Sequence, residues 1–147
     1  MIDAIDCIRD VEQRMKGLGI FGATNREKVV TVYSEDDLLS KMKFAVYPAC
    51  GVMYEGTVRQ PSDKSSSGAA CILTVALVLM IDGNSVGSTN DKGNVAAEYL
   101  GLMRQSFKKN CGDALTGHKW VFISEMPVGT SGNVTMYLQR WSTSIII

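Results

Sequence analysis

The sequence predicts an α+β fold: a mostly antiparallel sheet with two main helices packed on one face and a long β-hairpin loop. Two stretches carry apolar residues at helical spacing, near the N-terminus and after residue 93. β-Branched runs bounded by Gly, Ser and Asn lie between and after them. The order helix, strand, short helix, strand, strand, helix, strand, strand favours helices on one side of an antiparallel sheet. The 147 residues fit one domain with a substantial core.

The first helix is predicted over about residues 2–16. Its apolar stripe recurs at intervals of three or four and consists of Ile5, Ile8, Val11, Met15 and Leu18. Asp3 and Asp6 lie near the start, and Arg14 and Lys16 near the end, as the helix dipole favours. Gly17 is a plausible C-terminal stop.

A strand and a short helix are predicted next. Residues 28–33 are β-branched enough to form a strand. Ser34 then caps a short helix that runs through Met42, with Asp37 three positions after the cap. Pro48 cannot donate to a ladder, so it should open the following strand or lie on a sheet edge.

The long hairpin is predicted from two runs, residues 49–58 and 71–81. The second run is apolar on both faces apart from Thr74, so both of its faces must be covered, one by a helix of the same chain. The connection at residues 57–68, TVRQPSDKSSSG, has almost nothing apolar to bury. We expect it to order only against a partner, because ordering costs about 1–2 kcal/mol per residue.

The C-terminal half is predicted to be a helix followed by a hairpin. The helix covers residues 94–109 with an inward stripe of Ala96, Tyr99, Met103 and Phe107, and with Lys108 and Lys109 at its negative end. The hairpin strands are residues 119–125 and 134–142, joined by a loop over residues 127–133.

Charge and cysteine usage exclude several classes. Fifteen Lys and Arg balance fifteen Asp and Glu, which leaves no basic footprint for nucleic acid. The four cysteines form no C-x-x-C pair, and His118 is the single histidine, so no zinc site is predicted. Without a charged leader followed by an apolar core, we expect a cytosolic chain with reduced thiols. The apolar run at residues 69–81 is too short to span a membrane as a helix.

No catalytic constellation or cofactor site is predicted. The loop at residues 83–94 precedes a helix but lacks the G-x-x-x-x-G-K-[ST] spacing of a phosphate loop. His118 has no G-x-S-x-G elbow and is interpreted as a surface residue at the start of a strand. Glu55 and Glu125 could be invoked as paired acids, but each is expected to be solvated where a strand meets a loop.

The chain resembles the tail terminator proteins of tailed bacteriophages, and is most similar to the Mu-like branch found with contractile tails. The resemblance is carried by element order over most of the chain and by one short passage. That passage is residues 47–56, YPACGVMYEG, in which a proline is followed by a small apolar strand ending near an aromatic, an acid and a glycine. Gly51 departs from the larger branched residues expected there and could mark a bulge.

The resemblance implies a structural virion protein without catalytic residues or cofactors. It would form a hexameric ring that caps the tail tube, ends tail polymerisation and joins the head-side neck. The implied partners are further copies of the chain, the tail tube protein, and sheath or neck connector proteins; no membrane or sequence-specific nucleic acid is implied. The implied location is the head-proximal end of the tail in the virion, after assembly in the host cytoplasm.

The residues themselves favour an assembly role. An apolar strand, a mean hydropathy of +0.05 and the closing residues Ile145, Ile146 and Ile147 indicate more apolar area than one small domain covers. The predicted interface residues, on or near the hairpin loop, are Glu55, Arg59, Asp63, Lys64 and Ser66. A head–tail connector or stopper of the neck, or a small enzyme, stays open as an alternative.

Overall fold

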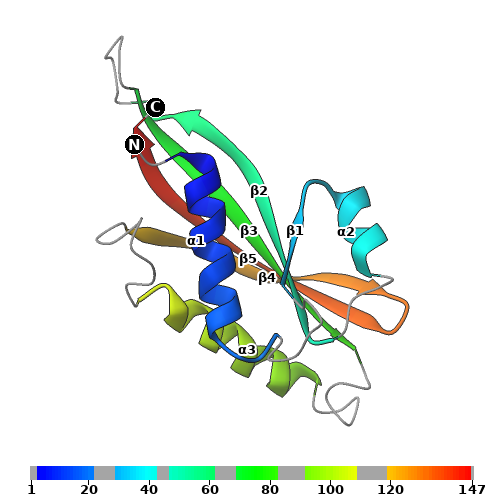
Figure 1. The fold of residues 1–147 in the computed structure, drawn as a ribbon. Helices are drawn as coiled ribbons and strands as arrows, with labels where there is room; N and C mark the ends of the chain where they lie inside the picture. The colour runs from blue at the N-terminus through cyan, green and yellow to red at the C-terminus, as the bar shows by residue number, and fades with distance from the viewer. Residues whose placement is uncertain are drawn as a thin grey trace.

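The computed structural model describes residues 3–21, 29–42, 47–61, 69–82, 92–108 and 119–146. Its elements are α1 (Ala4–Gly17), β1 (Val29–Val32), α2 (Glu35–Met42), β2 (Ala49–Arg59), β3 (Ala70–Asp82), α3 (Lys92–Ser106), β4 (Trp120–Ser131) and β5 (Val134–Ile146). The strands form one five-stranded sheet in the order β1-β2-β3-β5-β4, shown in Figure 1. Only β1 pairs in parallel, with β2; the other pairs are antiparallel. The predicted α+β fold is confirmed.

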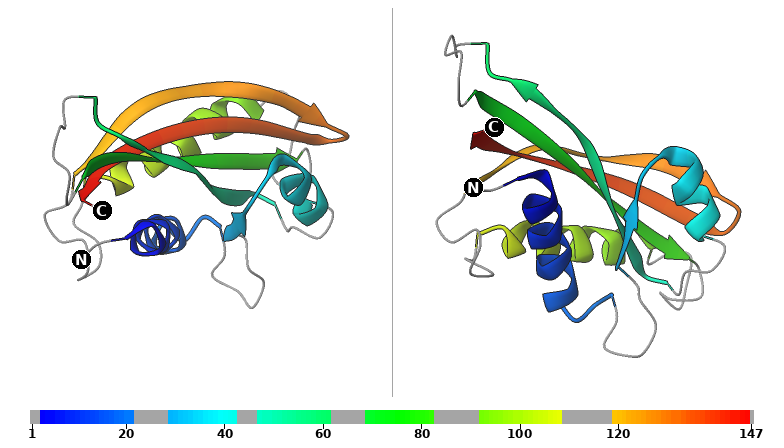
Figure 2. Two further views of the ribbon diagram at one scale, coloured as in Figure 1. Left: turned by 90° about the horizontal axis from the view of Figure 1, so that it is seen from above. Right: turned by 45° about the horizontal axis from the view of Figure 1, so that its top comes forward.

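Two apolar clusters lie on opposite faces of the sheet. α1 and α3 cover one face, where they pack on alternate residues of β3 such as Leu73, Leu77 and Ile81. The other cluster joins α2 through Leu38 to the intervening β3 residues, among them Val78. Figures 1 and 2 show α2 beside β1 at one end of the sheet, far from the tip of the β2–β3 hairpin. The prediction that both faces of β3 are covered therefore holds only for the end next to α2.

α1 begins at a capping box and buries a wider stripe than the predicted one. The Asp3 carboxylate accepts from the Asp6 N–H at 3.0 Å, and the Asp6 carboxylate accepts from the Asp3 N–H at 3.1 Å. The predicted stripe residue Ile5 is 57% exposed, while Asp10 and Arg14 are buried. The rest of the predicted stripe faces the core, with Val11 and Met15 buried and Ile8 and Leu18 packed against them, and the buried ion pair widens this inward face.

The short helix α2 starts at the predicted cap. Ser34 Oγ accepts from the Asp37 N–H at 3.1 Å, and the Asp37 carboxylate reaches back to the Tyr33 N–H at 3.0 Å. Gly51 lies beneath this helix in straight pairing with Val78, so it marks no bulge. A Cβ at Gly51 would approach the Val32 side chain to 3.1 Å, which explains why no larger residue stands there.

The β2–β3 hairpin extends beyond both predicted strands. Its register runs without interruption except at Glu55, where a bulge lies next to Gly56 with φ of 128°. The pairing continues to Arg59 opposite Cys71. A hydrogen bond of 2.9 Å from the Gln60 N–H to the Ala70 carbonyl extends it one step further. The predicted mobile segment at residues 57–68 therefore begins as ordered strand, and its residues 62–68 lie outside the described part of the chain.

α3 ends earlier than predicted. It stops at Ser106, and Lys108 lies beyond it in a turn, so the basic residue of its last turn is Arg104. The Phe107 N–H donates to the Arg104 carbonyl at 3.2 Å, a tightened last turn. The Phe107 ring stacks on Trp141 of β5 with centroids 4.0 Å apart. The contact lies one residue beyond the end of the helix. Lys109 lies outside the described residues.

The last hairpin is longer than predicted. Residues 127–131, expected in the loop, are the end of β4, and β5 runs on to Ile146. Pro127 is tolerated because β4 is an edge strand and a bulge follows at residue 128. The turn is only Gly132 and Asn133, with φ of 61° at Gly132 and no positive φ at Asn133, the pattern of a type II′ turn.

Candidate functional site

The edge strand β4 carries five of the ten large hydrophobic side chains that the described residues expose. No described strand pairs with this edge. Its exposed side chains, between 42% and 58% accessible, are Val121, Phe122, Ile123, Met126 and Val128. Sequence reasoning expected an ordinary hairpin here and missed this surface. The signal was available in the run VFISEMPV, which is apolar without the strict alternation of a half-buried strand.

A second unpaired edge lies at the other side of the sheet. β1 pairs with residues 50–53 of β2, so residues 54–59 of that strand, here called the outer β2 segment, contact only β3 in the sheet. Tyr54 and Val58 of this segment are exposed. The hydroxyls of Tyr54 and Thr57 are hydrogen-bonded to each other across the bulge. Besides the outer edge of β1, the described molecule thus has two open strand edges with exposed apolar side chains, on β4 and on the outer β2 segment.

The sheet face between these edges is only partly covered. Next to the hairpin tip, small and half-buried residues such as Thr74 and Ser142 pair across β3 and β5. Val121 of β4 is the cross-strand neighbour of Ser142. At the end of β5, Ile146 is 65% exposed. An ion pair of 2.8 Å between Arg140 and Glu55 crosses this face.

The predicted interface residues are partly located by the structure. Glu55 lies at the β2 bulge and accepts a hydrogen bond from Arg140 Nε, so it is held by the sheet and is not simply solvated. Arg59 is the exposed last residue of β2. Asp63, Lys64 and Ser66 lie outside the described residues, and so does His118.

Glu55 and Glu125 are not a catalytic pair. Glu125 lies on the helix-covered face, where it is paired with Arg104 of α3 and accepts from Gln139 Nε2 at 2.8 Å. Glu55 is bonded to Arg140 on the opposite face. The two carboxylates are therefore separated by the sheet. Glu55 is exposed as expected, whereas Glu125 is half-buried because it pairs with Arg104 and accepts from Gln139.

Gln139 organises a polar network inside the core. Its side chain is fully buried and donates to Glu125 and, at 3.2 Å, to the Leu100 carbonyl of α3. Its own amide oxygen accepts from the Trp141 indole at 2.7 Å. This arrangement satisfies the buried polar atoms and ties α3 to β4 and β5, a structural role.

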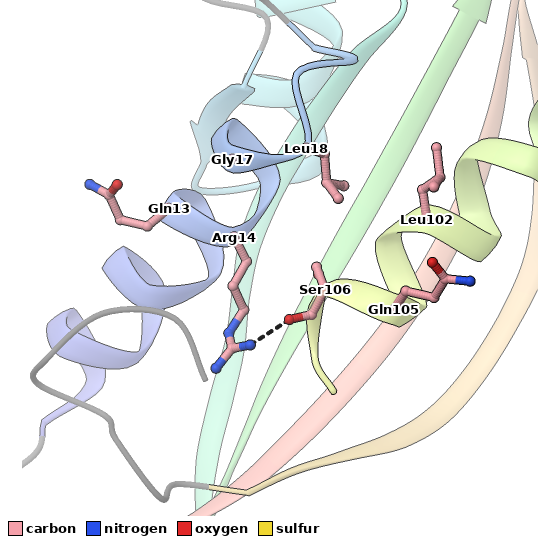
Figure 3. A pocket seen from close by; sticks show the side chains of 7 residues that line it. All are labelled: Gln13, Arg14, Gly17, Leu18, Leu102, Gln105 and Ser106. Atoms are coloured by element: carbon pink, nitrogen blue, oxygen red, sulfur yellow. Dashed lines mark hydrogen bonds between the residues drawn. The ribbon is translucent and has the colours of Figure 1, made fainter. Parts of the chain in front are cut away.

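A second network surrounds a small pocket between α1 and α3 (Figure 3). Arg14 Nε donates to the Asp10 carboxylate at 2.8 Å, and Arg14 Nη1 donates to the Ser106 carbonyl at 2.5 Å. The Trp120 indole donates to the same carboxylate at 2.9 Å. The Arg14 guanidinium also lies 5.5 Å from the Phe107 ring centroid. These bonds join α1, the end of α3 and the start of β4.

The pocket itself offers little chemistry. Its volume is about 180 Å³, and it is lined by Gln13, Arg14, Gly17, Leu18, Leu102, Gln105 and Ser106. The Ser106 hydroxyl donates to the Met103 carbonyl at 2.6 Å, so it is bonded within its own helix. No base lies beside it among the lining residues, and the guanidinium is already paired. The pocket holds no nucleophile–base pair of the kind that covalent catalysis uses.

The described cysteines are buried, and two of them have raised pKa values. Burial, followed by the charges of Asp10, Asp6 and Asp3, raises the pKa of Cys7 to about 11. Burial alone raises the pKa of Cys50 still further. Because the thiolate is the reactive form, these thiols are poor nucleophiles at neutral pH.

We therefore expect slow alkylation of Cys7 in the folded protein. A rise from the ordinary value near 9 to about 11 lowers the thiolate fraction roughly 100-fold at pH 7.5. In the folded Cys111→Ser variant, Cys7 should react with iodoacetamide at least 100-fold more slowly than in the same variant unfolded by denaturant. Peptide mass spectrometry follows the reaction at Cys7. Equal rates at Cys7 in both states would contradict the prediction. Between pH 9 and 11 the unfolded thiol ionises first, so the stability contributed by this group falls as pH rises.

No family model and no curated protein matches this chain. Within the described ranges, no three His, Cys, Asp or Glu side chains are grouped in a way that could hold a metal ion. Of the helices that the structure describes, none is both long and apolar enough to cross a membrane. The open edges of β4 and of the outer β2 segment carry seven of the ten large hydrophobic side chains that the described residues expose.

Proposed function

We propose that this protein is a structural virion protein, a tail terminator of a tailed bacteriophage. In this role it forms a hexameric ring that caps the tail tube, ends tube polymerisation and joins the tail to the neck. The observation that supports an assembly role is the concentration of exposed apolar side chains on the two open strand edges. The choice of a terminator among assembly proteins rests on the sequence resemblance.

The projecting β2–β3 hairpin is the element proposed to contact the tube or a neighbouring subunit. Its strands are paired as far as Gln60 and Ala70, so the connection between them starts from a rigid stem. Figure 1 shows that this end of the hairpin points away from α2. Arg59, one of the predicted interface residues, is the exposed last residue of β2 in this stem.

Shortening the hairpin connection tests this role. Replacing residues 61–67 with Asn-Gly leaves four residues, Asn-Gly followed by Gly68 and Ala69, between the paired Gln60 and Ala70. The hairpin is expected to stay folded, because loops of two to five residues commonly join paired strands. Tail capping should be abolished, and electron micrographs should show tails of uncontrolled length that fail to join heads. A Gly-Ser linker of equal length in place of residues 61–67 is the matched control, because it keeps the length of the connection and changes only its sequence. Tails of normal length that join heads with the shortened protein would remove the loop from the mechanism.

The location of the protein separates the terminator from the alternative. A neck connector or stopper would share the open edges and the hairpin. Cryo-electron microscopy of assembled tails should place the terminator directly on the last tube ring with six-fold symmetry. Density found only on the head side of another ring, or any other symmetry for this protein, would contradict the proposal.

A further inference from the structure

α1 and the sheet are held in the molecule by different kinds of contact. β3 forms backbone ladders with β5 over residues 70–82 and with β2 over residues 71–80. The backbone groups of a helix, in contrast, bond within the helix. α1 contacts β1, β2 and α3, and it does so through its side chains. Separating α1 from the sheet would therefore break no ladder, and the five strands could stay paired.

The contact between α1 and its neighbours contains a buried charged seam. Arg14 donates to the Ser106 carbonyl at the end of α3, and Asp10 accepts from the Trp120 indole of β4. Asp10 is 7% exposed and Arg14 is 3% exposed. Both charges lose their hydration when α1 is docked and regain it when α1 leaves. A buried ion pair thus contributes less to holding two elements together than its short distances suggest.

The seam is also incompletely filled. The pocket of about 180 Å³ lies between the ends of α1 and α3, where Leu18 and Leu102 are among its lining residues (Figure 3). Side chains beside such a space have fewer atoms to contact, so they gain less from dispersion. The fully buried apolar row of α1 consists of Cys7, Val11 and Met15. This one row and the charged seam make up the buried attachment of the helix.

α3 is attached to the sheet by further bonds. Gln139 of β5 donates to the Leu100 carbonyl, and Arg104 is paired with Glu125 of β4. The Phe107 ring, just after the helix, stacks on a tryptophan of β5. These bonds run between α3 and the β4–β5 pair, so they remain intact when α1 moves away.

We infer that α1 is a releasable cover of the sheet: it separates as one unit while α3 and the five strands stay folded. Release exposes the part of the helix-covered face on β1 and β2, where Val29, Cys50 and Val52 are buried in the same cluster as the apolar row of α1. Proteins open in such cooperative units when a unit has fewer stabilising contacts than the rest of the fold. The inference concerns the single chain and is independent of the proposed function.

The Cys7 thiol reports the release, because it is fully buried on α1 while the helix is docked. Labelling of Cys7 by iodoacetamide in the folded Cys111→Ser variant is measured by peptide mass spectrometry at increasing urea concentrations below the unfolding transition. Cys7 is expected to become exposed at least about tenfold more often than global unfolding allows. The urea dependence of this exposure should be less than about half of the global value, because it scales with the surface exposed.

Two substitutions locate the opening unit. Asp10→Ala changes the seam of α1 and should accelerate Cys7 labelling at least about 100-fold, because it leaves Arg14 without its anionic partner only while α1 is docked. Gln139→Ala changes the attachment of α3 and is the matched control. It should lower global stability and leave Cys7 labelling unchanged, because docked and released states both keep the Gln139 bonds. Should Asp10→Ala lose its folded circular dichroism spectrum, Asp10→Asn replaces it, with an expected acceleration of at least about tenfold.

The other results each overturn the inference. Cys7 exposure with the frequency and urea dependence of global unfolding would mean that α1 leaves only when the sheet unfolds. Labelling without any urea dependence would indicate a local fluctuation around Cys7 in place of helix release. Equal acceleration by Gln139→Ala and Asp10→Ala would mean that α1 and α3 open together. None of these results bears on the assembly role, which is judged on tails.

Discussion

Replacing Asp10 with alanine is expected to lower the free energy of unfolding by about 3–5 kcal/mol. The Asp10 carboxylate holds two buried partners, the Arg14 guanidinium at 2.8 Å and the Trp120 indole at 2.9 Å. The arginine side chain is only 2% exposed, so the variant removes an anionic partner from a guanidinium that is buried in the core. Removing one member of a buried pair costs more than the pair itself contributes.

Urea denaturation followed by tryptophan fluorescence measures this loss. Glu98→Ala is the matched control, because it removes an exposed acid from a helix, and its effect should stay within about 0.5 kcal/mol. The double variant Asp10→Ala, Arg14→Leu should recover part of the loss, since it leaves no buried charge. A loss below about 1 kcal/mol in the single variant would mean that Arg14 finds another partner and that the pair does not hold α1 in place.

A second large loss of stability is expected from Gln139→Ala, about 3 kcal/mol. The fully buried Gln139 accepts from the Trp141 indole and donates to the Leu100 carbonyl. Each buried polar group left without a partner costs about 1–3 kcal/mol, and the missing side chain also leaves a cavity. Glu125 loses a donor too and keeps Arg104. The variant should therefore weaken the attachment of α3 to the sheet.

Hydrogen exchange combined with urea denaturation tests this expectation. Amides of α3 should exchange faster in Gln139→Ala than amides of the β2–β3 pair, because the network binds the helix and not that part of the sheet. Gln105→Ala, at an exposed position on the same helix, is the matched control and should change neither measurement. Uniform acceleration over the whole described chain, with a small change in stability, would contradict the assigned role of Gln139.

Local sequence signals predicted the existence and type of every described helix and strand. The Ser34 cap and the β-branched and apolar runs of β2 and β3 act within a few residues, so they can be read from the chain. Errors arose where distant residues meet. Phe107 was placed inside α3, but it lies one residue beyond the end of that helix, where it stacks on Trp141 from far along the chain.

For the candidate site, the sequence indicated a surplus of apolar surface and a long hairpin, but not which edge carries that surface. Whether Ile123 is exposed depends on β4 being the last strand of the sheet, and strand order is a property of long-range pairing. The same holds for Glu55 and Glu125, whose arginine partners come from other elements.

The sequence by itself determined the α+β class, the order of elements and the absence of known catalytic motifs, because hydrophobic period, caps and turn residues are local properties. Tertiary structure alone decided the burial of Asp10 with Arg14, the length of β4 and the two open edges. These features depend on contacts between residues far apart in the chain. Their stability comes from packing and desolvation that no local pattern encodes.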